Sequence, residues 1–303
     1  MSRSLVDARR VWFALSGTVF ALAVAALIGW GLRFGIDFTG GSLMAFRFTN
    51  RPAVTELTEK IQGFGVETGA VVVQPVGDTE VQIRTKELTE TQYRQLVDGI
   101  KAQYGEVTEL RFDTIGPVIG EELRTKSLQG VAVALFLILL YIAYAFRKVS
   151  APVVSWKYGV VTMLSAAHDV VIPLGVFAAL GHFRQVEIGT PFVAAILTIL
   201  GYSITDTIVV MDRVRENLPR MKGSFAEIVD FSLRQTYLRS IFTSVTTLLS
   251  LLAIFFFGGA SLHEFTLVMI IGIAVGTYSS IFIAPMALVS WNEWDQKRKI
   301  GQK

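Results

Sequence analysis

Six long runs of apolar residues occupy most of this chain outside one segment of mixed composition. A run of about 18 or more apolar residues can cross the ~30 Å hydrocarbon core of a bilayer as a helix. The remaining segment, residues 33–126, has the composition of a globular domain. The sequence therefore predicts a polytopic α-helical membrane protein with six transmembrane helices, at about 11–32, 127–146, 156–180, 189–211, 240–258 and 265–291.

Lys and Arg are unevenly distributed between the two sets of segments that connect these runs. Loops rich in Lys and Arg stay on the cytoplasmic side of a membrane. Of all the Lys and Arg residues, only Arg184 lies in the two short connections near 181–188 and 258–264. We therefore expect both termini in the cytoplasm and residues 33–126 on the outer side. The basic residues assigned to the cytoplasm are Arg3, Arg9, Arg10, Arg147, Lys148, Lys157, Arg213, Arg215, Arg220, Lys222, Arg234, Arg239, Lys297, Arg298, Lys299 and Lys303.

The first apolar run follows Arg9 and Arg10, so a cleaved signal peptide is an alternative to a membrane anchor. The run is longer than the ~7–15 apolar residues of a signal peptide, which favours the anchor. The expected organisation is 1–32 for the cytoplasmic N-terminus and first span, 33–126 for an extracytoplasmic domain, 127–291 for the other five spans and 292–303 for a basic cytoplasmic tail.

Within residues 33–126, strand and helix patterns follow one another in a regular order. Their order, β-α-β-β-α-β, is that of a small α+β domain of the ferredoxin-like kind. This segment has no histidine, and the whole chain has no cysteine and no HExxH spacing, so we expect no cofactor, no metal site and no covalent catalysis. A binding or lever role is expected instead. The strands are predicted at 43–49, 71–73, 81–84 and 107–114, and the helices at 53–64 and 89–102.

A glycine-rich segment joins the first span to this domain. Gly40 and Gly41 permit backbone conformations that are closed to other residues, and the side chain of Asp37 is suited to capping a turn. Two interpretations remain open at this stage. The segment is either a shaped linker or a hinge that transmits motion from the membrane spans to the domain.

Asp206 lies in an otherwise uncharged stretch, 188–211, that is long enough to span a membrane. A carboxylate at the centre of a membrane helix costs ~2.5–3.5 kcal/mol on insertion scales, and such residues usually serve ion or substrate movement. Tyr202 and Ser203, one turn earlier, are expected to share its face. Arg239, at the start of the fifth span, is expected at a similar depth. A static ion pair, or an Arg239 that only extends to the headgroups, is the structural alternative.

A second acidic residue, Asp169, lies in the third span beside His168. Pro173 follows four residues later and cannot donate a hydrogen bond to the Asp169 carbonyl, so a kink is expected at this depth. Two acids in one membrane region suggest that the protein handles protons. The alternative is that His168 and Asp169 only bond neighbouring helices.

Two further patterns concern helix packing. Gly272, Gly276 and Ser280 form a row of small residues that allows another helix to approach closely, either within the chain or from a partner subunit. Ser224 and Glu227 have the spacing of a capping box. With Phe225, Ile228 and Phe231, they predict an amphipathic helix lying on the cytoplasmic leaflet between the fourth and fifth spans.

Several segments of the chain resemble the SecD/SecF family of the bacterial Sec protein-export machinery, in particular its SecF members. The similarity runs nearly from end to end, and the segment 201–217 is highly specific. The segments are GIDFTGGSL (35–43), AHDVVIPLG (167–175), GYSITDTIVVMDRVREN (201–217), LRSIFTSVTTLL (238–249) and FGGASLHEFTLVMIIGIAVGTYSSIFIAP (257–285).

The resemblance implies one half of a transporter of the RND superfamily, in the bacterial inner membrane, with SecD as the other half. It implies that the pair uses the proton motive force to promote export after the step of SecA and SecYEG. It also implies that Asp206 and Arg239 take part in proton movement, while His168 and Asp169 belong to a shared motif. The implied partners are SecD, the SecYEG translocon with SecA, YajC and YidC, and an exported polypeptide as substrate.

Two other functions fit part of the sequence. A small-molecule exporter of the same superfamily needs twelve spans and two large outer domains in one chain, whereas six spans and one domain are predicted here. A non-transporting membrane scaffold for the translocon has no need of an acid at position 206.

Overall fold

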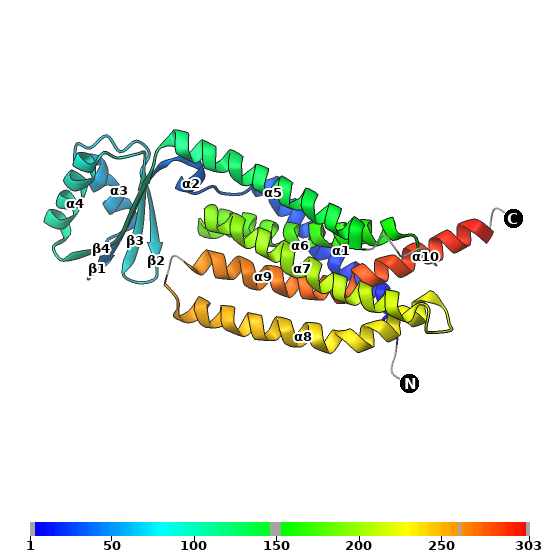
Figure 1. The fold of residues 1–303 in the computed structure, drawn as a ribbon. Coiled ribbons are helices and arrows are strands. Elements are labelled where there is room, and N and C mark those ends of the chain that lie inside the picture. Colours follow the sequence, from blue (N-terminus) through cyan, green and yellow to red (C-terminus); the bar gives the residue numbers. More distant parts are fainter. Residues whose placement is uncertain (1–3, 146–152, 260–261, 301–303) are drawn as a thin grey trace. The chain divides into compact units, whose positions relative to one another are not determined.

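The computed structural model describes residues 4–145, 153–259 and 262–300, and the chain divides into two compact units. One unit contains residues 33–129 and 187–190, and the other contains the rest of the chain. Figure 1 shows a bundle of long helices and a small domain built on a sheet. Because the two units are not placed relative to one another, each is described by itself.

Among the described residues, six stretches of helix are long and apolar enough to cross a membrane, which confirms the predicted number of spans. Most extend beyond the predicted apolar runs, because the helical backbone continues into polar residues at the ends. They are α1 (Arg9–Trp30), α5 (Pro117–Ala145), α6 (Ser155–Arg184), α7 (Thr190–Asn217), α8 (Phe225–Phe257) and the pair α9 (His263–Phe282) and α10 (Ala284–Ile300).

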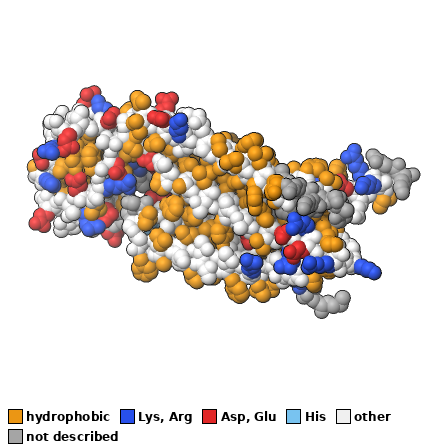
Figure 2. Space-filling model, in the orientation of Figure 1, with side chains coloured by type: hydrophobic (Ala, Val, Ile, Leu, Met, Phe, Trp, Pro, Cys, Tyr) orange, Lys and Arg blue, Asp and Glu red, His pale blue; other side chains and the backbone are white. Residues whose placement is uncertain are grey.

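The centre of the helical unit is formed by α6 and α9, which are the most buried spans together with α7. α1 packs along α6, and α8 packs along α9. The contact of α1 with α6 depends on Gly175, because a Cβ there would lie 2.4 Å from the Cα of Ala23. On the face drawn in Figure 2, the helical unit carries its charged side chains near the end with α10, and the rest is largely apolar or uncharged.

The sixth span is not the single helix that the apolar run predicted. α9 ends at Phe282, and α10 begins at Ala284. Pro285 explains the break, because proline has no N–H to donate and disfavours helical backbone at the residue before it.

The prediction of a separate amphipathic helix between the fourth and fifth spans is also wrong. The capping box of Ser224 and Glu227 is present, but it starts one continuous helix, α8, that runs to Phe257. No glycine or proline interrupts this stretch, so nothing ends the helix before the span begins. Phe225 and Ile228 are buried in the helical unit, and only Phe231 is exposed.

The small domain has the predicted β-α-β-β-α-β order. Its four strands form one antiparallel sheet in the order β2-β3-β1-β4, which confirms the ferredoxin-like fold. The core lies between the sheet and the two helices and includes Met44, Phe46, Ile61, Leu96 and Ile100. The elements are β1 (Gly41–Phe48), α3 (Val54–Gly63), β2 (Val72–Val76), β3 (Glu80–Thr85), α4 (Glu90–Tyr104) and β4 (Val107–Ile115).

The glycine-rich segment that leads into β1 contains a short helix, α2 (Ile36–Thr39), which the sequence did not indicate. Gly40 and Gly41 follow it with φ of 72° and 124°, in the region that favours glycine. A Cβ at Gly40 would lie 2.7 Å from the Cα of Pro117, and a Cβ at Gly41 would lie 2.6 Å from the carbonyl oxygen of Thr85. The chain therefore enters and leaves the domain through a tightly packed crossing.

Candidate functional site

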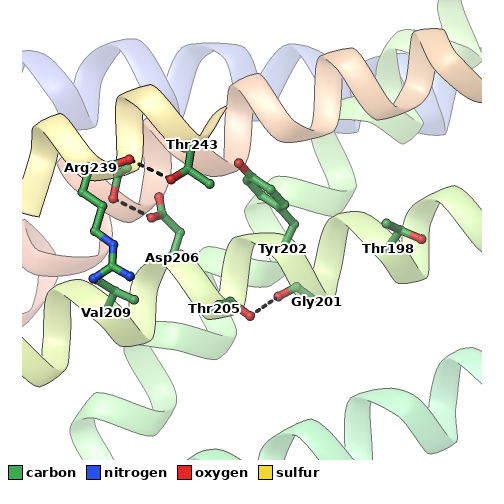
Figure 3. Close-up of a pocket in the computed structure, with 9 residues that line it drawn as sticks. Thr198, Gly201, Tyr202, Thr205, Asp206, Val209, Arg239 and Thr243 are labelled. Carbon is green, nitrogen blue, oxygen red and sulfur yellow. Dashed lines mark hydrogen bonds between the residues drawn. The ribbon is translucent and has the colours of Figure 1, made fainter. Parts of the chain in front are cut away.

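A cleft lies along α7 and α8 on one side of the helical unit, with a volume of about 390 Å³. Most of its lining side chains are hydroxyl-bearing or small, which is unusual for a surface formed by two apolar spans. Figure 3 shows Asp206 within this lining. The lining residues are Thr198, Gly201, Tyr202, Thr205, Asp206, Val209, Arg239, Ser240 and Thr243.

Asp206 is half-buried in this cleft, and its two carboxylate oxygens have different surroundings. Oδ1 accepts a hydrogen bond of 2.5 Å from the hydroxyl of Ser240 on α8. Oδ2 is buried and has no hydrogen-bond partner among the described residues. A buried carboxylate oxygen without a donor is costly, and such an atom is suited to carry a proton.

Arg239 lines the same cleft but forms no ion pair with Asp206 in the part of the chain that the structure describes. Its side chain is exposed, and Figure 3 shows the guanidinium directed away from the carboxylate of Asp206. The next residue, Ser240, is the one that reaches Asp206. Asp206 and Arg239 therefore line the same cleft, as expected, but they do not pair directly among the described residues.

Tyr202 and Ser203 do not both share the face of Asp206, as the spacing along α7 had suggested. Tyr202 lines the cleft, and its hydroxyl is 3.1 Å from that of Ser244 on α8, which is 2.5 Å from that of Thr277 on α9. Ser203 is buried and points into the bundle instead. Three residues correspond to 300° around a helix, so Ser203 is offset from Asp206 by about 60°.

Ser203 belongs to a second polar site, which is centred on Asp169. The Asp169 side chain is completely buried, and its Oδ2 accepts hydrogen bonds from Ser203 on α7 and from Ser279 on α9, the latter 2.6 Å long. The hydroxyl of Ser165 on α6 donates to that of Ser279. One carboxylate therefore ties together three spans at the centre of the unit.

His168 extends this buried site to a fourth helix. Its Nδ1 is 2.8 Å from Oδ1 of Asp169, and its Nε2 is 2.6 Å from the hydroxyl of Ser16 on α1. The ring also stacks on Phe20 of α1. All side-chain polar atoms of this pair have partners, in contrast to Asp206, so the geometry of His168 and Asp169 is that of a structural junction.

The row of small residues on α9 faces α7 of the same chain. A Cβ at Gly272 would lie 2.2 Å from Cδ1 of Ile199, and a Cβ at Gly276 would lie 3.0 Å from the Cβ of Ser203. The hydroxyl of Ser280 donates to the carbonyl of Ser203. Of the two interpretations of this row, the geometry supports internal packing, which seats α7 closely enough for Ser203 to reach Asp169.

The predicted linker residues lie in the other unit. Asp37 accepts a hydrogen bond of 2.7 Å from the backbone N–H of Thr190, the first residue of α7. Sequence reasoning did not identify Ser16, Ser240 or Ser279 as members of either polar site. Their only signal is a hydroxyl within an apolar run, which many membrane helices carry for other reasons.

In the described part of the chain, six helical stretches long enough to span a membrane, a ferredoxin-like domain after the first, and the carboxylates of Asp169 and Asp206 within the bundle define a multi-pass membrane protein of the transport class. A family model described as "Protein export membrane protein SecD/SecF, C-terminal" matches residues 95–294, and one described as "SecD/SecF GG Motif" matches residues 26–50. The chain belongs to the SecD/SecF family of protein translocase subunits, as a SecF-type member.

The similarity to individual SecF subunits covers nearly the whole chain. The protein translocase subunit SecF of Thermobaculum terrenum is 39% identical over 304 residues, which cover 96% of this chain and 94% of the relative. The subunit SecDF of Thermus thermophilus is 39% identical over 277 residues, which cover 89% of this chain and 36% of the relative. In that relative, SecD and SecF are therefore named as one protein.

Two solved structures of SecDF have the same fold. The crystal structure of the Thermus SecDF, described as a translocon-associated membrane protein, matches with a TM-score of 0.84 and 36% identity over 96% of this chain. A SecDF structure in a "Super-membrane-facing form" matches with a TM-score of 0.70 and 35% identity. The chain spans 39% and 40% of those two chains, respectively.

Proposed function

We propose that this protein, together with a SecD half, uses the proton motive force to promote protein export across the bacterial cytoplasmic membrane. The observation that carries the proposal is Oδ2 of Asp206, which has no hydrogen-bond partner among the described residues and lies in a cleft between two spans lined by several hydroxyl-bearing side chains. Both carboxylate oxygens of Asp169, in contrast, already accept hydrogen bonds within the bundle. An oxygen without a donor can accept a proton without breaking an existing bond.

Protonation of Asp206 would neutralise a charge that is costly inside a membrane. Each elementary charge that crosses the membrane provides ~2.3 kcal/mol per 100 mV, which is available for movement of the spans. We propose that Asp206 alternates between a charged state, stabilised by Ser240 and by water in the cleft, and a neutral state that permits closer helix packing. In this proposal, the coupling of proton movement to export involves no covalent catalysis.

Arg239 is proposed as the second charged member of this site. It lines the cleft from α8, and its side chain is long and exposed. A change of its rotamer would bring the guanidinium toward a deprotonated Asp206, where it would stabilise the negative charge. Protonation would release it. Arg239 would thus make the position of α8 depend on the protonation state of α7.

The proposed partners follow from the family. SecD is the first, because a relative carries SecD and SecF in one chain and because the cleft with Asp206 is open on the side of exposed Gly201 and Thr205. The SecYEG translocon with SecA would deliver the exported polypeptide. The distribution of Lys and Arg supports cytoplasmic termini and an extracytoplasmic domain at 33–126.

The function is tested by gradient-dependent export in membrane vesicles that contain SecD, SecYEG and SecA. Asp206→Asn keeps the shape of the side chain but cannot cycle a proton. The variant should therefore assemble normally with its partners, and its export should no longer respond to the gradient. Export that still responds to the gradient in this variant would exclude the proton role of Asp206.

The half-transporter arrangement has its own test. A cysteine at exposed Thr205 should crosslink to the central spans of SecD, because it lies one residue from Asp206 on the open side of α7. A cysteine at buried Ser203, which faces Asp169 in the same chain, is the matched control and should not crosslink. Two results together would contradict the need for a SecD half. The cysteine at Thr205 would fail to crosslink, and the purified chain alone would conduct protons.

A further inference from the structure

The connection between α6 and α7 belongs to the compact unit of the small domain, although both helices are membrane spans. Residues 187–190 group with residues 33–129. α6 ends at Arg184, where Gln185 adopts a left-handed conformation and the N–H of Val186 returns to the carbonyl of Leu180. Between this point and the first residue of α7, the chain makes three kinds of contact with the domain.

The first contact is a short backbone pairing with the segment that leads out of α1. The N–H of Gly35 donates to the carbonyl of Ile188 at 2.9 Å, and the N–H of Ile188 donates to the carbonyl of Arg33 at 2.8 Å. These bonds form a parallel bridge between Phe34 and Ile188. Gly35 allows the approach, since a Cβ there would lie 3.4 Å from the Ile188 carbonyl oxygen and 3.3 Å from the carboxylate of Glu187.

The second contact is an ion pair between Glu187 and Arg84, which lies on β3 in the sheet. The side chains of both residues are largely buried, at 13% and 16% exposed. Arg33 is also within 4.0 Å of the Glu187 carboxylate. A buried pair of this kind is strongly destabilised when one partner is removed, because the other charge then stays buried alone.

The third contact is the cap that Asp37 provides for the N-terminus of α7. The first N–H groups of a helix have no partner within the helix, and a negative charge near them is favourable. Asp37 Oδ2 accepts from the N–H of Thr190, 153 residues away in sequence, and Pro191 has no N–H to satisfy. From Asp37 the chain passes through α2 and the packed Gly40–Gly41 crossing directly into β1.

These contacts define an α7 clamp, formed by Arg33, Asp37, Arg84, Glu187, Ile188 and Thr190. The clamp holds the end of the helix that carries Asp206, about 24 Å away along the helix axis.

We propose that the α7 clamp is the element through which movement of α7 drives the outer domain during export. This inference rests on the proposed function, since it assumes that protonation of Asp206 moves α7. Its residues position the domain and take no part in proton transfer. Breaking the clamp should therefore uncouple the two activities, so that protons still cross while export no longer benefits.

The test measures proton flux and gradient-dependent export in the same vesicles, with SecD and the translocon present. Arg84→Glu should lower gradient-dependent export at least fivefold and leave proton flux within twofold of the native level. Asp37→Ala should act in the same direction. The double variant Arg84→Glu with Glu187→Arg restores an ion pair with reversed charges, and it should recover most of the export.

The matched control is Arg47→Glu, because Arg47 pairs with Glu80 on the same sheet at an exposed position outside the clamp. Its export should stay near the native level. Native export by both Arg84→Glu and Asp37→Ala would overturn the proposal. Loss of flux together with export, or no recovery in the reversed pair, would also overturn it and leave the clamp a folding element. If Asp206→Asn retains gradient-dependent export, the proposed function fails irrespective of the clamp variants.

Discussion

The hydroxyl of Ser240 on α8 is the only described hydrogen-bond donor that reaches Asp206 on α7, at 2.5 Å from Oδ1. The other carboxylate oxygen faces no donor in the described ranges. This asymmetry separates Asp206 from Asp169, whose carboxylate is bonded on both oxygens. The acid whose Oδ2 has no partner among the described residues lies at the cleft, and the acid with both oxygens bonded lies inside the helical unit.

Ser240→Ala should weaken gradient-dependent export without abolishing it. A hydrogen bond to a charged group contributes ~1.5–3 kcal/mol, so its loss corresponds to a fall in rate of about 10-fold to 150-fold if the charged state limits turnover. Export assays with and without a gradient measure the effect. Ser250→Ala is the control, because the Ser250 hydroxyl bonds only the backbone of its own exposed turn. Equal export by Ser240→Ala and the native protein would contradict a role for this bond.

Asp169→Ala should destabilise the helical unit strongly. The change leaves His168 and two buried hydroxyls without their acceptor, and removing one partner of such a group costs ~3–5 kcal/mol. Asp169→Asn should cost less, because the amide oxygen still accepts. Thermal unfolding in detergent, followed by helical circular dichroism, measures both. Thr246→Ala is the control, since its exposed hydroxyl bonds only its own helix. A midpoint for Asp169→Ala within the error of the native value would refute the junction.

Gly272→Ala should force α9 away from α7, because the new Cβ would meet Cδ1 of Ile199 at 2.2 Å. Overpacking of this kind costs ~1–3 kcal/mol. Ile199→Ala creates space, so the double variant should be more stable than the sum of the two single changes predicts, by ~1 kcal/mol or more. Gly130→Ala on α5 has nothing within 4 Å and should be neutral or slightly stabilising. Simple additivity would show that the two side chains do not meet.

The sequence predicted the number of spans, the β-α-β-β-α-β domain and the capping box at Ser224, because each has a local pattern. It did not predict the break between α9 and α10, although Pro285 is visible, because the apolar run continues through it. The sequence also did not predict that the helix beginning after Ser224 continues without a break into the fifth span. Hydrophobicity marks where a membrane can lie, and helices end where capping or proline ends them.

The sequence indicated the charged residues of the candidate site but not the residues that form hydrogen bonds with them. Asp206, Arg239, His168 and Asp169 stand out because charge is rare in apolar runs. Which hydroxyl meets which acid depends on the rotation of each helix about its axis, and this is set by packing such as that of Gly276 on Ser203. The Asp37 bond to Thr190 joins residues with no local relation in sequence, so no pattern could indicate it.

The orientation of the chain is tested by labelling single cysteines in a protein that naturally has none. A cysteine at exposed Gln62 in α3 should react with a membrane-impermeant reagent added from outside intact cells, and one at exposed Gln296 in α10 should not. Both should react after permeabilisation, which serves as the control. The reverse pattern would invert the orientation and, with it, the direction of proton movement.

The most direct measurement is proton flux into vesicles that contain this chain and SecD, under an imposed gradient and followed with a pH-sensitive dye. The account predicts that Asp206→Asn lowers the flux to the level of vesicles without the pair. Asp212→Asn is the matched control on the same helix, because Asp212 is partly exposed and pairs with Arg215. It should leave the flux unchanged. Native flux through Asp206→Asn would contradict the central claim that this carboxylate carries the proton.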